Sequence, residues 1–376
     1  MRTAVVTGDY FKPGQTMVNR HIEHLFGGNT CVIANAGTKE NPFDKAVYAR
    51  RQIDRSLVDL VTTPLIKGFN RVAYGTSRIP VGERREALIR FLKDQDVEVM
   101  LAEFGTECLG MADIAELLDI PCFCYFRGAD ASYSLQQGSR VRGYRRMFPK
   151  LTGVFAVSQF LLDNLAQHGI AHVNSHVVPS GVNVERFQPG DKRPRSFCMI
   201  GRMVEKKSPL LTIRAFLEAA GDAPDAHLTV VGSGPLLEPA RTLVTQMGGS
   251  DRVEFTGALP HEEVRAVLAR SEIFLQHSVT AADGNTEGLP TSIQEALASG
   301  CVVISTRHAG IPEAVEDGTN GWLVDEHDAA GFTKLIGKAL AADTSAMTAA
   351  ARKSAIDRFD NSKLLTKVED VICSSV

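Results

Sequence analysis

Residues 283–312 read DGNTEGLPTSIQEALASGCVVISTRHAGIP, and this stretch decides how the second half of the chain folds. Asp283–Leu289 has many small polar residues and no apolar period, which indicates a loop. Thr291–Ser299 carries apolar residues at helical spacing, and Cys301–Ser305 is a short apolar run typical of a strand in a parallel sheet. The loop Arg307–Ile311 follows the strand at its carboxyl end. Open α/β sheets bind ligands at that end, so we expect a binding site here.

Two carboxylates frame the predicted helix: Glu287 lies in the loop before it, and Glu295 lies on the helix. Pro290 suits the first helical position, because its missing N–H would have no partner there. Unpaired N–H groups at a helix start attract an anion, helped by the helix dipole. This arrangement suits a phosphorylated sugar, and the alternative is a capped surface helix with two solvated glutamates. The N–H groups expected to face the anion belong to Gly288, Leu289 and Thr291.

The stretch resembles the retaining glycosyltransferases of family four, which have the GT-B fold. Those enzymes carry a Glu, seven residues and a second Glu, and Glu287 and Glu295 match that spacing. The longer string SVTAADGNTEGLP, residues 278–290, is similar to the branch that builds bacterial exopolysaccharides. The resemblance implies that Glu287 contacts the donor sugar and that Glu295 contacts the ribose of the nucleotide. Gly310 is expected to approach the donor phosphates.

The composition indicates two globular domains. The chain has 376 residues, of which 44% are hydrophobic and 23% are charged, so each half can bury a core. The net charge of −3 gives no case for nucleic-acid binding, so any anion site must be local. The seven scattered Cys indicate reduced thiols in a cytoplasmic protein, and no pair of Cys motifs has zinc-ligand spacing. No export signal and no membrane-spanning run is recognisable, so we expect a cytoplasmic protein, with peripheral contact at the inner membrane face as a further option.

Apolar runs alternate with helical patterns along the whole chain, which predicts an α/β protein of two doubly wound, Rossmann-like domains facing a cleft. We expect these domains at 1–189 and 196–355, and the resemblance implies that the first lies on the acceptor side and that the second binds the nucleotide-sugar donor. In the GT-B fold, the last helix, here about 362–376, usually packs back on the first domain. Asp44–Thr62 has helical spacing, with three arginines on its other face. The expected strands are Thr3–Thr7, Cys31–Ala34, Val97–Ala102, Pro121–Phe126, Gly153–Ser158, Ser196–Ile200, Ala226–Val231, Arg252–Thr256, Glu272–Gln276, Cys301–Ser305 and Gly321–Val324.

Two loops of the first half carry candidate binding residues. Gly14 lies where the family has two adjacent glycines near donor phosphate or acceptor, and an ordinary turn is the alternative. Arg127-Gly128-Ala129-Asp130 matches a family loop that commonly reads His-Gly-x-Asp. Arg127 cannot act as a base at neutral pH, but it can hold a phosphate or a carboxylate of the acceptor. Asp130 is expected either to orient an acceptor hydroxyl or to cap the next helix.

The segment RVRGYRRMFPK, residues 140–150, combines basic and aromatic side chains. Such a segment can rest on an anionic membrane surface, where a lipid-linked acceptor would lie. A solvated basic face and a subsite for an anionic glycan are the alternatives. Its cations are Arg140, Arg142, Arg145, Arg146 and Lys150.

The loop Gly201–Lys207 holds the cations that the resemblance assigns to the donor diphosphate, Arg202 and Lys207. Breaking the bond between sugar and phosphate builds negative charge on the leaving group, which fixed cations stabilise. Such a pair can replace a divalent metal, so we expect no metal and no cofactor. The family usually has Gly after this Lys, and Ser208 stands there instead. The later Gly232-Ser233-Gly234 lacks the third glycine of a dinucleotide-binding fingerprint.

The resemblance implies a retaining glycosyltransferase that moves a sugar from a nucleotide-diphosphate sugar to a glycan, lipid-linked or small-molecule acceptor, in cell-surface polysaccharide or glycoconjugate synthesis. The catalytic residues would be Glu287, Arg202 and Lys207. Two alternatives remain at this point: a nucleotide-sugar epimerase or phosphorylase on the same fold, and a protein that binds a sugar nucleotide without transferring the sugar.

Overall fold

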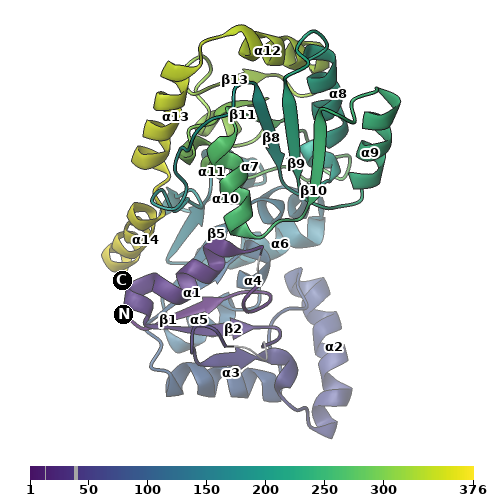
Figure 1. Cartoon of the computed structure of the whole chain (residues 1–376). Coiled ribbons are helices and arrows are strands. Elements are labelled where there is room, and N and C mark those ends of the chain that lie inside the picture. The colour runs from purple at the N-terminus through teal and green to yellow at the C-terminus, as the bar shows by residue number, and fades with distance from the viewer. Residues whose placement is uncertain (13, 38–40) are drawn as a thin grey trace. The chain divides into compact units, whose positions relative to one another are not determined.

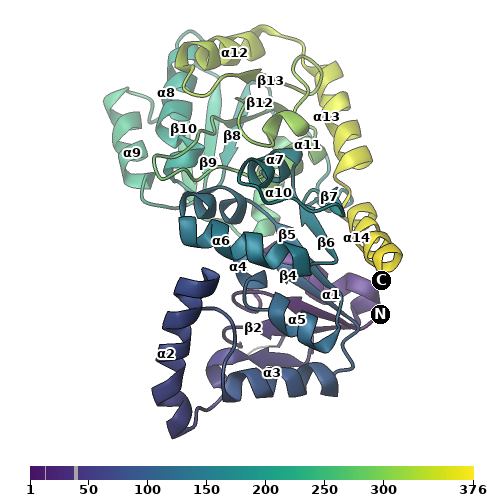
Figure 2. The same ribbon diagram turned by 180° about the vertical axis from the view of Figure 1, so that it is seen from behind.

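The computed structural model describes residues 1–12, 14–37 and 41–376. The chain forms two compact units, Met1–Val178 with Leu365–Val376, and Pro179–Leu364. Each unit is built on a parallel sheet flanked by helices, as Figures 1 and 2 show. The expected pair of doubly wound α/β domains is therefore confirmed. The limits expected for an acceptor-side and a donor domain, 1–189 and 196–355, stay predictions.

The first unit has a seven-stranded sheet with the order β3-β2-β1-β4-β5-β6-β7. All its neighbouring strands pair in parallel, and β1 lies between β2 and β4. Its strands are β1 (Thr3–Val6), β2 (Thr30–Ala34), β3 (Val47–Ala49), β4 (Val99–Glu103), β5 (Cys122–Phe126), β6 (Gly153–Ala156) and β7 (Ser175–Val177). Its helices are α1 (Thr16–Gly28), α2 (Leu57–Tyr74), α3 (Glu83–Asp94), α4 (Gly105–Cys108), α5 (Ala112–Leu118), α6 (Gly138–Met147) and α7 (Gln159–Gln167).

The second unit has a six-stranded parallel sheet with the order β10-β9-β8-β11-β12-β13. Apolar side chains of α8, α9 and α12 pack on one face of this sheet and form its core. The strands are β8 (Ser196–Ile200), β9 (His227–Val231), β10 (Val253–Gly257), β11 (Ile273–Gln276), β12 (Val302–Thr306) and β13 (Gly321–Val324). The helices are α8 (Pro209–Ala219), α9 (Leu237–Gln246), α10 (His261–Arg270), α11 (Thr291–Ala298), α12 (Ala329–Ala341) and α13 (Ser345–Arg358).

The final helix, α14 (Asn361–Ser375), begins in the second unit, but its residues from Leu365 on belong to the first unit. Glu369 accepts a hydrogen bond from the Phe26 N–H at 2.5 Å, and Lys367 Nζ donates to the Val177 carbonyl at 3.0 Å. Val368 and Ile372 on the same helix are fully buried. The first unit is therefore completed by the final residues of the chain.

The expectation of a helix over Asp44–Thr62 is wrong. The chain there forms the short edge strand β3, a 3-10 turn η1 (Arg50–Gln52) and only then α2. Val47 pairs with Val32 of β2, so its burial comes from the sheet. Apolar residues spaced three or four apart can satisfy both patterns when the strand is this short.

Helix α2 is inverted relative to an ordinary surface helix. Its buried residues are polar, namely Asp59, Thr63 and Asn70. Asp59 has a local reason to point inward, because its carboxylate accepts a hydrogen bond from the Glu83 N–H at the start of α3 at 2.8 Å. An apolar stripe, 62% to 82% exposed, covers the solvent side. We call this set the α2 stripe: Leu57, Val58, Val61, Leu65, Phe69 and Val72.

Two further sequence expectations concern thiols and membrane spans. All seven cysteines are free, and they are buried with the exception of Cys373, so the expected reduced thiols are confirmed. Within residues 1–12, 14–37 and 41–376, no helix is both long and apolar enough to cross a membrane.

Candidate active site

The order of strands reverses between β8 and β11, which are neighbours in the sheet of the second unit. Ligands of open α/β sheets bind beyond the carboxyl ends of the strands at such a switch point. The loop after β8 carries Arg202 and Lys207, and the loop after β11 carries Glu287. Folding thus brings these two loops, distant in sequence, to the same edge of one sheet.

Glycines allow the loop after β8 to lie directly against the loop after β9. The Gly201 N–H donates to the Val231 carbonyl at 2.9 Å, and the Met203 N–H donates to the Ser233 carbonyl at 2.9 Å. A Cβ atom on Gly232 would lie only 1.8 Å from the Gly201 carbonyl oxygen. The Gly-Ser-Gly sequence therefore serves a close approach of two main chains.

The turn η5 (Glu205–Lys207) directs two ammonium groups at one carboxylate. Lys207 Nζ lies 3.1 Å from Glu287 Oε1, and Lys206 Nζ lies 3.3 Å from Glu287 Oε2. Ser208 ends the turn in the left-handed region, with φ of 41°. That conformation favours glycine, which is the residue that the family resemblance leads one to expect at this position.

The carboxylate and the two ammonium groups are nearly buried, with side-chain exposures of 11% for Glu287, 10% for Lys206 and 11% for Lys207. Burial raises the pKa of Glu287, but Lys207 and Lys206 outweigh burial and hold this pKa at about 2. Burial lowers the pKa of Lys206, and Glu287 opposes that change. Glu287 is therefore ionised at neutral pH, and its single negative charge faces two basic side chains.

Neighbouring groups fix both lysines in place. Lys206 Nζ donates to the Thr286 carbonyl at 2.9 Å, and Lys207 Nζ donates to Gln276 Oε1 at 3.1 Å. The same Gln276 oxygen accepts from the Ser292 hydroxyl at 3.1 Å. The first turn of α11, the end of β11 and the turn η5 therefore form one hydrogen-bonded assembly.

A histidine holds the main chain of Glu287. The Glu287 N–H donates to His308 Nε2 at 3.1 Å, and His308 Nδ1 lies 2.6 Å from a Glu326 oxygen. His308 therefore carries its proton on Nδ1 and accepts on Nε2. Gly310 adds a second tie, since its N–H donates to the Gly288 carbonyl at 2.9 Å. The loops before α11 and after β12 are thus joined.

Helix α11 begins at Thr291, so Pro290 is the N-cap residue and not the first helical residue. Within the described part of the chain, no protein acceptor is recorded for the N–H groups of Gly288, Leu289 and Thr291. Glu295 is half-buried, and His261 Nε2 lies 3.2 Å from its carboxylate. The helix start therefore keeps its positive end without a protein partner, as an anion site requires.

Arg202 is exposed on the loop that carries the two lysines. Its positive charge acts on Lys206: burial lowers the pKa of Lys206 most, Lys207 lowers it further, and Arg202 also lowers it. Three basic side chains thus lie on one loop, opposed by Glu287. Fixed cations of this kind stabilise charge that develops on a leaving phosphate. Lys206 and His308 were not among the residues predicted from the sequence, although both lie in the two loops singled out there.

In the first unit, Arg127 is part of a buried network. Its Nε lies 2.8 Å from a Glu103 oxygen, and His21 contacts the other oxygen of the same carboxylate. The Arg127 guanidinium also lies over the Tyr125 ring, 3.8 Å from its centroid. Burial raises the pKa of Glu103, but Arg127 and His21 reverse this and set it at about 2. This network could not be predicted from the sequence, because its members are far apart along the chain.

Asp130 holds its own loop together. One oxygen accepts from the N–H groups of Arg127 at 3.0 Å and Gly128 at 2.9 Å, and the other accepts from the Gly105 N–H at 3.0 Å. Gly14 is exposed, and no heavy atom lies within 4 Å of the position of a Cβ atom there. The acceptor roles of Arg127 and Asp130 and the donor role of Gly14 stay predictions.

The basic segment 140–150 lies on α6 and on the 3-10 turn η4 (Phe148–Lys150) that follows it, and its charge is partly neutralised. Arg146 and Lys150 both pair with Asp113, at 2.5 and 2.8 Å. Arg145 donates to the His168 carbonyl at 2.7 Å. The fully basic face that the sequence suggests is thus reduced to a few exposed cations.

Two family models together match most of the chain. The model for glycosyl transferases group 1 matches residues 183–356, and the model for glycosyltransferase family 4 matches residues 39–186. The WcaL protein of Escherichia coli K12, named for colanic acid biosynthesis as a glycosyltransferase, is 30% identical over 327 residues, which are 84% of this chain and 79% of that protein. The amylovoran biosynthesis glycosyltransferase AmsK of Erwinia amylovora is 30% identical over 215 residues, which are 56% of this chain and 53% of that protein.

Solved structures show the same fold at low sequence identity. Anabaena Alr3699/HepE in complex with UDP has a TM-score of 0.78 at 16% identity, over 100% of both chains. Sucrose-phosphate synthase from Thermosynechococcus elongatus has a TM-score of 0.73 at 15% identity, over 99% of this chain and 98% of that one. The chain belongs to the group 1, family 4 glycosyltransferases with the GT-B fold, and it is a glycosyltransferase.

Proposed function

We propose that this enzyme transfers a sugar from a nucleotide-diphosphate sugar, with retention of the anomeric configuration, to a glycan or lipid-linked acceptor in polysaccharide synthesis. The observation that carries the proposal is the Glu287 carboxylate between Lys206 and Lys207, at the switch point of the second sheet. The named roles of WcaL and AmsK in colanic acid and amylovoran biosynthesis support the polysaccharide part. The UDP in the HepE structure supports a nucleotide donor.

Each candidate side chain has one task in this proposal. Glu287 accepts hydrogen bonds from hydroxyl groups of the donor sugar, and Glu295 binds the ribose. Arg202 and Lys207 stabilise the leaving diphosphate, with Lys206 as a further cation. The leaving phosphate oxygen takes the proton of the acceptor hydroxyl on the face where the new bond forms, so no protein base is needed.

The free N–H groups at the start of α11 are proposed to meet the donor phosphates, since a helix N-terminus favours negative charge. We expect the reaction to need no metal, because the cations of one loop supply the charge that stabilises the leaving group. Unchanged turnover in EDTA is the expected result, and loss of turnover that Mg²⁺ restores would contradict this part.

The test is a transfer assay with UDP, GDP, ADP and dTDP sugars, in which the product is resolved from free sugar and its anomeric configuration is read by NMR. Lys207→Ala should lower kcat about a hundredfold or more, as expected for the loss of a fixed charge at the leaving group. Lys334→Ala is the matched control, because Lys334 is an exposed lysine of α12 in the same unit. An altered sugar nucleotide without transfer, an inverted product, or full turnover of Lys207→Ala would refute the proposal.

We further propose that the first unit makes peripheral contact with an anionic membrane surface. Helix α2 packs beside α6, where the Arg146 guanidinium lies 4.2 Å from the centre of the Tyr74 ring. The C-terminal end of the α2 stripe, where Phe69 contacts Tyr74, therefore lies near the basic segment, and Arg142 and Arg145 on α6 are exposed. Apolar side chains with neighbouring cations are typical of surfaces that bind anionic lipid.

Cosedimentation with vesicles tests the membrane contact. Binding should increase when phosphatidylglycerol is added to phosphatidylcholine, and Leu65→Ser with Phe69→Ser should abolish it. Leu117→Ser is the control, since Leu117 is an exposed leucine on α5 of the same unit, 54% exposed. Membrane contact would be refuted if Leu117→Ser lost vesicle binding to the same extent. It would also be refuted if the wild type formed a dimer that the stripe variant alone could not form.

A further inference from the structure

A second site lies in the first unit, at the carboxyl ends of β1 and β2. A pocket that is open to solvent lies there, and its lining includes Thr7, Asn35, Arg50, Arg78 and Glu107. The strand order reverses between β1 and β4, so this is the switch point of the first sheet. Thr7 follows β1, Asn35 follows β2, and Glu107 lies on α4 after β4. The site is thus equivalent in position to the donor site of the other unit, but its side chains differ.

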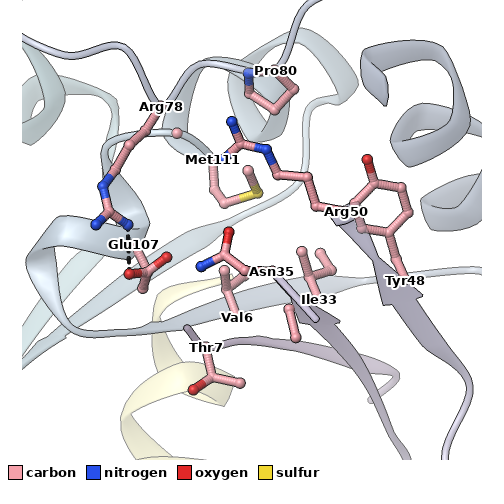
Figure 3. A pocket seen from close by; sticks show the side chains of 12 residues that line it. Val6, Thr7, Ile33, Asn35, Tyr48, Arg50, Arg78, Pro80, Glu107 and Met111 are labelled. Carbon is pink, nitrogen blue, oxygen red and sulfur yellow. Dashed lines mark hydrogen bonds and ion pairs between the residues drawn. The ribbon is translucent and has the colours of Figure 1, made fainter. Parts of the chain in front are cut away.

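Two arginines dominate the wall of this pocket. Figure 3 shows the side chains of Arg50 and Asn35 extending into the space that Arg78 and Glu107 border. The Arg78 guanidinium pairs with Glu107 at 2.5 Å. No hydrogen bond or ion pair joins the Arg50 guanidinium to any residue that the structure describes. Thr7 is 1% exposed, and its hydroxyl likewise has no partner among those residues.

Among the residues that the structure describes, cations outnumber carboxylates in the lining of the pocket. Burial lowers the pKa of Arg50, and the positive charges of Arg84 and Arg78 lower it further. Burial lowers the pKa of Arg140, and the charge of Arg78 lowers it further. Burial likewise lowers the pKa of Lys67, and the charges of Arg50 and Arg84 lower it further. Glu107 is the carboxylate that faces this group from α4, and Arg78 already engages it. An anion would relieve this repulsion and give Arg50 a partner.

We propose that this pocket binds an anionic group of the acceptor, a carboxylate or a phosphate, through the Arg50 and Arg78 guanidinium groups with Thr7 and Asn35 as neutral partners. The proposal rests on the proposed function, because it assumes that the acceptor binds to this unit. Planar guanidinium groups suit both anions, since each can donate two parallel hydrogen bonds. The anion is either a uronic-acid carboxylate or a glycan or lipid phosphate.

Direct titration of the full chain, with no sugar donor present, distinguishes a carboxylate ligand from a phosphate ligand. The probes are methyl β-D-glucuronide, methyl β-D-glucoside and inorganic phosphate, each measured by calorimetry. We expect binding of the glucuronide or of phosphate, and none of the neutral glucoside. Arg50→Gln should weaken anion binding at least tenfold, as for the loss of one charge-assisted pair. Glucuronide binding would identify the carboxylate source, and phosphate binding alone would identify the phosphate source.

Two matched variants test whether the loss of anion binding is specific to Arg50. Arg51→Gln removes the same charge from the next residue of η1, which is exposed, and should bind as the wild type does. Lys207→Ala removes a cation of the proposed donor site; it should leave glucuronide binding unchanged, and it should leave unchanged the part of the phosphate binding that Arg50→Gln removes. Binding that Arg51→Gln or Lys207→Ala weakens equally, equal binding of the glucoside, or no binding of either anion would overturn the proposal.

The outcome is independent of the donor experiment. Loss of transfer in Lys207→Ala with no anion binding would retain the donor site and reject this pocket. If the chain binds an anion through Arg50 but transfers no sugar, the pocket would be retained and the proposed transferase function would be rejected.

Discussion

Replacement of Glu287 by Gln is the most direct test of the charge arrangement in the second unit. The substitution keeps the size of the side chain and removes the negative charge between the two lysines. Glu287 has a pKa of about 2 in place of the ordinary 4.5. A difference of one in pKa corresponds to ~1.4 kcal/mol, so the ionised carboxylate contributes roughly 3 kcal/mol to the free energy of unfolding at pH 7. We expect Glu287→Gln to lose about that amount.

The pH dependence has a definite sign. The folded pKa of Glu287 lies below the unfolded value, so its contribution is complete above about pH 4.5 and is lost as the pH falls toward 2. The difference between the wild type and Glu287→Gln should therefore be largest at neutral pH. Below about pH 4.5 it should shrink by ~1.4 kcal/mol for each pH unit.

The chain contains its own reporter for this measurement. Trp322 is the single tryptophan, it is 5% exposed, and it lies on β13 in the same unit as Glu287. Urea unfolding followed by its fluorescence therefore reports that unit, although a chain of two units need not unfold in one step. Glu295→Gln is the control and should change stability by less than about 1 kcal/mol, because Glu295 has one exposed histidine as its partner. A loss below about 1 kcal/mol for Glu287→Gln at pH 7, or a loss that does not shrink in acid, would refute the reasoning.

Further predictions concern backbone conformation and acid stability. Ser208→Gly should raise the free energy of unfolding by up to about 1 kcal/mol, because residue 208 has a φ of 41°, and a loss in the same urea titration would contradict this. Gly232→Ala should cost about 3 kcal/mol or more, since its Cβ would lie 1.8 Å from the Gly201 oxygen. Gly337→Ala, in the interior of α12 with no atom within 4 Å, should instead add about 0.5–1 kcal/mol, and equal effects of the two alanines would show that contact distance does not govern them. Glu103→Gln should flatten the loss of stability below about pH 4.5, because the pKa of Glu103 is about 2; circular dichroism in acid measures this, and an unchanged acid profile would show that the Arg127 network does not stabilise the charged form.

Much of the fold is readable from short apolar runs. The expected strands Ser196–Ile200 and Gly321–Val324 agree with β8 and β13 at both ends. Parallel strands are buried on both faces, so their sequences are almost continuously apolar and stand out from the polar loops. The helix expected over Thr291–Ser299 agrees with α11 to within one residue, and Gly300, just after it, has a left-handed φ of 68°.

The interpretation failed where apolar residues do not face a core. In Asp44–Thr62, Val47 belongs to a three-residue edge strand and Leu57 begins a helix that exposes its apolar side. Periodicity locates an apolar face, but it cannot say whether protein, lipid or water covers that face.

In the candidate site, too, some contacts could be predicted from the sequence and others could not. The contact of Lys207 with Glu287 joins two loops that the sequence had already singled out. The roles of His308 and of the pair His21–Glu103 depend on distant residues meeting in space. A lone histidine or glutamate in one sequence carries no signal for such a meeting.

The inverted burial of α2 also bears on how this sequence is kept through evolution. The six large apolar side chains of the α2 stripe lie in solvent, so polar replacements at those positions would cost the folded state very little. Mutational drift under selection for folding alone would soon replace such residues, because most accessible substitutions are polar and surface positions accept them. If homologous chains keep apolar residues at the α2 stripe, the pressure that keeps them acts on what the helix touches outside the chain.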